Sequence, residues 1–131
     1  MFEEFQDMVK RARSIRRFDQ SHRLTHQELA ELVDLARLSP SGANLQPLKY
    51  ILSVDQNVNG RIFPHLRWAG YIRDWDGPAE GERPAGYIVI LGDRDIAKNF
   101  TGWPARIDHG IAAEVMMLGA AMKGLGCCMI A

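Results

Sequence analysis

The sequence has few cysteines, no net charge and no long hydrophobic run, and each shortage excludes a class of protein. Its two cysteines, Cys127 and Cys128, are adjacent, so they cannot form a disulfide framework, and we interpret both as reduced packing residues. Sixteen basic side chains balance sixteen acidic ones, so no overall field gathers nucleic acid or anionic membrane. No stretch approaches the roughly 18 consecutive apolar residues of a membrane span. The N-terminus also lacks a signal-peptide core, so we expect a cytoplasmic protein.

What remains is an ordinary globular composition. Hydrophobic residues make up 47% and charged residues 24% of the 131 residues, which excludes disordered and fibrous chains. A chain of this length fits one hydrophobic core, so we expect a single domain over residues 1–131. The segment Gly124-Leu125-Gly126 lacks the third glycine and the preceding strand of a dinucleotide fingerprint, so a classical Rossmann domain gets no support.

Hydrophobic periodicity and capping residues predict helices interspersed with strands. Thr25 followed by Glu28 is a capping box that starts one helix, which Ser39-Pro40 ends. The apolar run Tyr87–Leu91 predicts a strand in the sheet centre, buried on both faces. An earlier amphipathic helix is expected to lie on the body of the protein. The full prediction has helices at about 2–10, 25–39, 57–68 and 108–123, strands at 48–54, 87–91 and 125–131, and an exposed loop at 74–84.

The helix predicted from Asp108, its N-cap, to Lys123 is apolar on nearly every side. Leu118 and Met122 belong to one apolar stripe, and the residues between are mostly Ala, Gly and Met. A single small domain has few elements that could cover such a helix. We therefore expect part of the cover to come from a second subunit at a two-fold interface.

A basic run and a polar loop are the two candidate binding motifs. Residues 10–17 contain five cations and Ser14 in a neutral protein, and arginine forks with a hydroxyl match the oxygens of a phosphate monoester. The alternative interpretation is a solvated helix end, where the helix dipole favours lysine and arginine, and for the run alone this is the preferred one.

The second motif, Pro40–Pro47, lies between a predicted helix and a predicted strand. The side-chain amides of Asn44 and Gln46 both donate and accept hydrogen bonds. This suits the edge of a flavin ring, which carries donors as well as acceptors. An ordinary connecting loop, with Asn44 in a left-handed turn and Gln46 solvated, accounts for it as well.

Together these segments resemble the FMN-dependent nitroreductases, and the resemblance covers nearly the whole chain. The matching segments occur in the family's order and approximate spacing. They are Arg13-Ser14-Ile15-Arg16-Arg17-Phe18, Leu38-Ser39-Pro40-Ser41-Gly42-Ala43-Asn44-Leu45-Gln46-Pro47, Asp108-His109-Gly110-Ile111-Ala112-Ala113, and Leu118-Gly119-Ala120-Ala121 through Gly124-Leu125-Gly126.

The resemblance implies an α+β fold of the three-layer α/β/α type, with a central mixed β-sheet flanked by helices and a long central apolar helix. It implies that Arg13 and Ser14 hold the FMN phosphate and ribityl chain, and that Arg16 reaches toward N1 and the C2 carbonyl. A loop that reaches the flavin from the partner subunit matches Pro40, Ser41, Gly42 and Asn44, with Gln46 beside them. The backbone at the N5 side of the ring matches Met129, Ile130 and Ala131.

The activity that the resemblance implies is hydride transfer from NADH or NADPH through FMN to a nitroaromatic, quinone or similar small acceptor, in a homodimer. The chemistry belongs to the flavin, so we expect no catalytic side chain. We expect no metal either, because His22 and His26 straddle a helix cap. Neutral charge and the absence of a known nucleic-acid-binding signature argue against a nucleic-acid partner.

Two departures from the family leave a second function open. Ala12 stands where many members have another arginine. Family members also continue for several more elements, whereas this chain stops in the apolar run 127–131, from which we expect a C-terminally truncated family member. The alternative function is therefore a non-catalytic module that binds flavin or another phosphorylated ligand.

Overall fold

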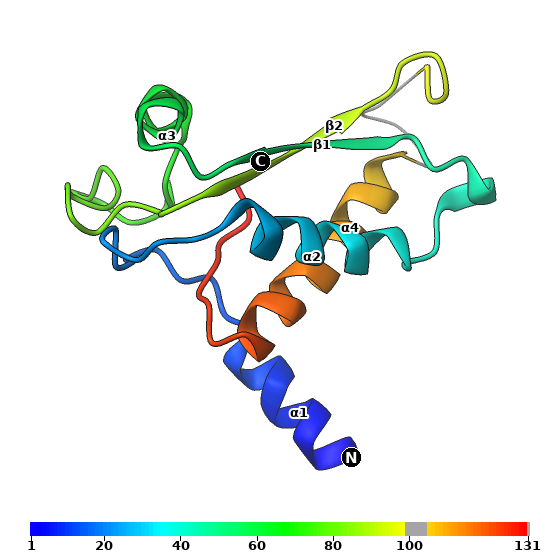
Figure 1. Ribbon diagram of the computed structural model, residues 1–131, viewed down its shortest axis with the longest axis horizontal. Helices are drawn as coiled ribbons and strands as arrows, with labels where there is room; N and C mark the ends of the chain where they lie inside the picture. Colours follow the sequence, from blue (N-terminus) through cyan, green and yellow to red (C-terminus); the bar gives the residue numbers. More distant parts are fainter. Residues whose placement is uncertain (99–104, 131) are drawn as a thin grey trace.

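An antiparallel pair of strands forms the centre of the computed structural model, which describes residues 1–98 and 105–130. β1 (Leu48–Ser53) and β2 (Tyr87–Gly92) pair from Leu48 opposite Gly92 to Ser53 opposite Tyr87. α3 (Gln56–Ile62) lies on one side of the strands, and α2 (His26–Arg37) and α4 (Ala105–Met122) lie on the other (Figure 1). This layered arrangement of helices and strands confirms the predicted α+β fold class.

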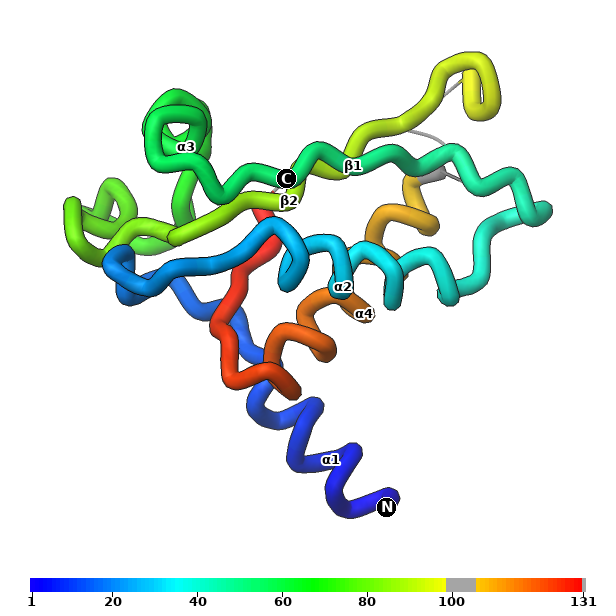
Figure 2. The backbone as a smooth tube through the Cα atoms, viewed as in Figure 1, coloured from blue at the N-terminus to red at the C-terminus, as the bar shows by residue number. Residues whose placement is uncertain are grey.

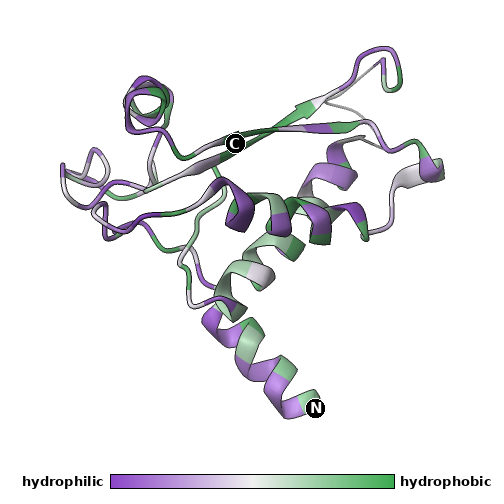
Figure 3. Ribbon diagram, in the orientation of Figure 1, coloured by the Kyte–Doolittle hydropathy of each residue, from purple (hydrophilic) through white to green (hydrophobic). Residues whose placement is uncertain are grey.

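The core is the contact between α2 and α4 beneath the strands. Leu32 and Ala36 of α2 pack on Ala112, Met116 and Ala120 of α4, all at most 7% exposed. The alanines let the two helices approach closely, and half-buried side chains of both strands close the cluster from above. Figure 3 shows the second half of α4 as hydrophobic to neutral, in contrast to the charged first turn.

Local signals set the ends of α2 and α3. The predicted capping box of α2 is present: the Thr25 hydroxyl accepts from the Glu28 N–H at 3.2 Å, and the Glu28 carboxylate accepts from the Thr25 N–H at 2.7 Å. α3 ends earlier than predicted, and a 3-10 turn, Phe63–His65, follows it. Pro64 explains the early end, because proline has no N–H with which to continue the helical ladder.

The predicted central position of β2 is wrong. Within the described residues the sheet has two strands, so β2 is half-buried and Leu91 is exposed. The predicted strand at 125–131 is also absent over 125–130, where an isolated parallel bridge joins Cys127 to Ser14. An apolar run therefore indicates that a segment packs against its neighbours, but it does not determine which strands pair.

The expectation that the first helix lies on the body of the protein is wrong as well. α1 (Phe2–Arg11) forms as predicted, but none of its residues is buried, and it projects away from the core (Figure 1). Phe2 and Phe5 remain 76% and 51% exposed. None of the helices in the described part of the chain has the length and hydrophobicity to span a bilayer.

Candidate functional site

The arginine-serine segment and the C-terminal segment lie side by side. The Ile15 N–H donates to the Cys127 carbonyl at 2.9 Å, within the bridge that pairs Ser14 with Cys127. Gly126 permits this approach, because a Cβ there would lie 2.9 Å from Ile15 Cγ2. Figure 2 shows the C-terminal segment in red beside the segment that follows α1. The structure thus pairs Ser14 with the segment that contains Met129 and Ile130, whereas Ala131 lies outside the described residues.

The arginines of this segment differ in their partners. The Arg17 guanidinium lies 3.7 Å from the Glu82 carboxylate, while no ion pair of Arg13 or Arg16 occurs among the described residues. The Arg16 guanidinium lies 5.7 Å from the centre of the exposed Tyr71 ring. Two cations therefore remain without a counter-ion in the described chain, which favours an anionic ligand here.

An apolar groove of about 830 Å³ adjoins this segment. Ile15 and Arg17 line it from the N-terminal side, Met129 and Ile130 line it from the C-terminal segment, and β2 contributes Tyr87 through Ile90. Its volume lies within the range of about 300 to 1,000 Å³ that small-molecule sites occupy. The groove offers apolar surface for a flat ring. Arg17 lines it, and Arg13 and Arg16 lie close in sequence to the lining residue Ile15.

Cys127 and Cys128 line the same groove. Burial raises the pKa of the Cys127 thiol to about 11, and the neighbouring Cys128 and Glu114 add to the shift. The Cys127 thiol is therefore protonated at neutral pH, as expected of a packing residue.

The polar loop is built on a buried carboxylate. Asp108, 3% exposed, accepts from the Ser41 hydroxyl at 2.5 Å and from the Gly42 N–H at 2.9 Å. α4 begins at Ala105, so Asp108 is not the N-cap that we predicted, and its carboxylate binds a loop distant in sequence. The Ser41 hydroxyl in turn accepts from the Gln46 N–H at 2.9 Å. The cap prediction missed this contact because helix periodicity carries no information on partners 66 residues away.

Asn44 and Gln46 are exposed at the surface of this loop. The Gln46 side-chain amide donates to the Asn44 side-chain oxygen at 2.8 Å, so each amide keeps part of its hydrogen-bonding capacity for a ligand. Asn44 has the left-handed conformation, with φ of 54°, that an ordinary turn would also give it. Pro40 is exposed at the start of the loop.

The loop and the arginine-serine segment lie at opposite ends of α4. Asp108 in the first turn contacts the loop, and Cys127, beyond the last turn, contacts the N-terminal segment. The 18 residues of α4 correspond to a helix about 27 Å long. One chain therefore does not bring the two predicted halves of the site together (Figure 1).

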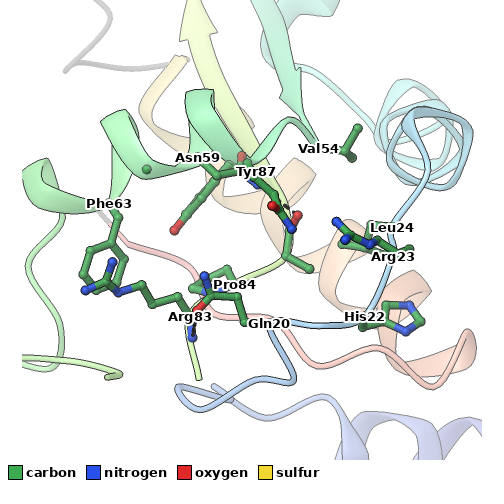
Figure 4. Close-up of a pocket in the computed structure, with 13 residues that line it drawn as sticks. Gln20, His22, Arg23, Leu24, Val54, Asn59, Phe63, Arg83, Pro84 and Tyr87 are labelled. Atoms are coloured by element: carbon green, nitrogen blue, oxygen red, sulfur yellow. Dashed lines mark hydrogen bonds between the residues drawn. The ribbon is translucent and has the colours of Figure 1, made fainter. Parts of the chain in front are cut away.

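A second, smaller pocket of about 60 Å³ lies between α3 and the segments at 20–24 and 83–87 (Figure 4). The Arg83 guanidinium lies 4.3 Å from the centre of the Phe63 ring, and burial raises the pKa of Tyr87 to about 12. The sequence patterns did not mark this pocket, and it is too small for a flavin. No group of three or more His, Cys, Asp or Glu side chains that could hold a metal occurs in the described residues.

The fold is that of an α+β protein with an apolar groove lined in part by the C-terminal segment. Residues 9–131 match the family model described as the Nitroreductase family. The chain therefore belongs to the nitroreductase family.

Individual relatives match over part of their length. A Bacillus subtilis (strain 168) protein assigned as the NAD(P)H nitroreductase MhqN is 37% identical over 59 residues, 45% of this chain and 29% of that protein. The oxygen-insensitive NADPH nitroreductase of Helicobacter pylori (strain ATCC 700392 / 26695) is 30% identical over 63 residues, 48% of this chain and 30% of that protein. Each alignment thus covers less than a third of the relative.

Solved structures match over nearly the whole chain. A nitroreductase family protein from Clostridium novyi NT has a TM-score of 0.74 and 26% identity, covering 98% of this chain and 69% of that protein. A Desulfovibrio desulfuricans protein described as a nitroreductase in complex with FMN has a TM-score of 0.71 and 20% identity, covering 93% and 64%. These matches confirm the nitroreductase fold.

Proposed function

We propose that the protein is an FMN-dependent oxidoreductase that passes hydride from NADH or NADPH to a nitroaromatic, quinone or similar small acceptor. The observation that carries the proposal is the bridge between Ser14 and Cys127. It joins the segment of Arg13 and Arg16, which have no ion pair in the described chain, to a C-terminal segment that lines the apolar groove. Family membership supports it. So do relatives named for NADPH and a similar fold solved with FMN.

The described residues fit FMN in shape and charge. The groove has room for a tricyclic ring, and the exposed Ser14 adjoins the lining residue Ile15 in the chain. Arg13 and Ser14 would bind the phosphate and ribityl chain, since guanidinium and hydroxyl groups match phosphate oxygens. Arg16 would supply positive charge at the polar edge of the ring, and the backbone of Met129 and Ile130 would face the opposite edge.

Bound FMN would supply the hydride transfer itself. The role of this chain is then to orient the ring, to hold a fixed positive charge near it, and to leave one ring face open to donor and acceptor in turn. A cation fixed beforehand costs no reorganisation when negative charge develops, so Arg16 would favour reduction of the ring.

The site would need two subunits. Ser41, Gly42, Asn44 and Gln46 lie the length of α4 away from the arginine-serine segment of their own chain. A partner related by a two-fold axis could bring its own loop to the groove, which completes both sites of a homodimer at once.

The visible spectrum of the purified protein tests this function. After incubation with excess FMN and gel filtration, the protein should be yellow, and NADH or NADPH should bleach the flavin band until an acceptor such as a quinone restores it. A yellow protein inert to both nicotinamides would instead indicate a flavin-binding module without catalysis. A colourless protein would contradict both functions.

A further inference from the structure

We propose that Asp108 is a positioning residue that holds the Ser41–Gln46 loop in the shape in which it contacts the flavin, an inference that rests on the proposed function. The contact joins two parts of the chain that are 66 and 67 residues apart. It links the first turn of α4 to the part of the loop that precedes the exposed amides.

The geometry around the Asp108 carboxylate commits both of its oxygens to the loop. Oδ2 accepts from the Ser41 hydroxyl at 2.5 Å, and Oδ1 accepts from the Gly42 N–H at 2.9 Å. The side chain is almost fully buried, so water does not compete for these bonds and hydrogen bonds to the charged group are strong. Removal of the carboxylate would leave a partly buried N–H and hydroxyl without this acceptor.

The loop has a backbone shape that requires such an anchor. Ala43, Asn44 and Gln46 lie in the left-handed backbone region, with φ of 50°, 54° and 52°. This region is unfavourable for most residues other than glycine and asparagine. Strained residues of this kind persist where surrounding contacts hold them. Here the chain of contacts runs from Asp108 to the Ser41 hydroxyl and from there to the Gln46 N–H.

The anchored loop turns its ligand-binding groups outward. Asn44 and Gln46 are exposed, and their mutual hydrogen bond fixes the relative orientation of the two amides. Asp108 itself is buried and does not reach a ligand. It therefore acts through the loop, by reducing the entropy that the loop would lose when it contacts the ring.

Two substitutions at Asp108 separate this role from general stability. Asp108→Ala removes both acceptors, and we expect the Kd for FMN to rise about tenfold. Asp108→Asn keeps an oxygen for the Gly42 N–H and can donate to Ser41, so we expect it to recover most of the affinity. Asp34→Ala, which removes an exposed carboxylate of α2, should leave the Kd unchanged. Quenching of flavin fluorescence during titration measures all four proteins.

Amide hydrogen exchange of the protein without flavin provides the second readout. In Asp108→Ala, the Gly42 and Gln46 amides should exchange at least tenfold faster, while amides of the β1–β2 ladder keep their wild-type rates. Equal exchange of Gly42 and Gln46 in wild type and variant would overturn the anchor, even in a protein that binds FMN. A wild-type protein that binds no FMN would overturn the proposed function and the flavin role of the loop. An Asp108→Asn variant as weak as Asp108→Ala would also contradict the proposed geometry.

Discussion

Arg16 and Arg23 lie in the same N-terminal stretch but differ in position relative to the groove. Arg16 adjoins the Ser14–Cys127 bridge, whereas Arg23 lines the small pocket near α3. We expect Arg16→Ala to raise the Kd for FMN at least tenfold, because it removes a charge-assisted contact. Arg23→Ala should change the Kd less than twofold. Fluorescence titration measures both, and equal effects would remove Arg16 from the site.

Burial of Cys127 predicts a pH dependence of stability. The thiol pKa is about 11 in the folded protein, against about 8.5 in an unfolded chain. Between these values the folded state binds more protons, so the free energy of unfolding must fall as pH rises through this window. Urea denaturation at several pH values should show a shallower fall for Cys127→Ala than for wild type.

Cys128→Ala is the matched control for that measurement. It removes the adjacent thiol of the same segment and should change the slope of stability against pH between about 9 and 11 less than Cys127→Ala does, because burial is the largest cause of the Cys127 shift. Identical slopes for wild type and Cys127→Ala would show that the Cys127 thiol is not buried as the structure places it.

Among the elements, the contact between the two terminal segments depends on Gly126. A Cβ at this position would lie 2.9 Å from Ile15 Cγ2 and 3.0 Å from Ile15 Cβ, and a β-branched side chain has little freedom to move aside. Gly126→Ala should therefore open the Ser14–Cys127 bridge, lower stability by about 1 to 3 kcal/mol and weaken FMN binding.

Gly60→Ala in α3 is the control, because no atom lies within 4 Å of its added Cβ. Alanine is the better helix former by about 1 kcal/mol, so this variant should be at least as stable as wild type in thermal unfolding. Should Gly126→Ala melt and bind FMN like wild type, the terminal segments do not meet as described.

The elements also show which parts of the fold sequence patterns could predict. The capping box at Thr25 and Glu28 located the start of α2 because both partners lie within one turn. The apolar run at 125–130 predicted a strand, yet a bridge to Ser14 is what the structure shows, because strand pairing depends on partners far along the chain. α1 was predicted from the spacing of Phe2 and Phe5, but spacing cannot tell what a helix packs against.

The candidate site also has residues that sequence motifs predicted and a contact that they did not. Motif spacing predicted Arg13, Ser14 and Arg16 as site residues, and the structure pairs Ser14 with Cys127 of the segment that also contains Met129 and Ile130. The roles of these residues toward a cofactor stay a prediction. The partnership of Asp108 with Ser41 had no local signal, because it joins two elements across the fold. A buried aspartate next to an apolar helix face is the feature that could have raised the question, since such a carboxylate needs hydrogen-bond partners.

For the whole molecule, the distance between the loop and the arginine-serine segment within one chain predicts a dimer. The loop and the arginine-serine segment lie at opposite ends of α4, and Phe2, Phe5 and Met122 leave large apolar side chains exposed. We expect light scattering at micromolar concentration to give about twice the chain mass of 14.8 kDa. A monodisperse monomer that retains FMN would contradict the shared site.

Mixing two variants with impaired FMN binding tests whether each site contains residues of both subunits. Arg16→Ala impairs the segment and Gly42→Pro impairs the loop, because proline removes the N–H that binds Asp108. Random pairing after joint refolding makes half of the dimers mixed, and each mixed dimer contains one site with both wild-type halves. About a quarter of all sites should therefore regain wild-type FMN affinity, while each variant refolded alone regains none. If each site lay within one chain, every chain would carry one impaired half and the mixture would bind no better than its components.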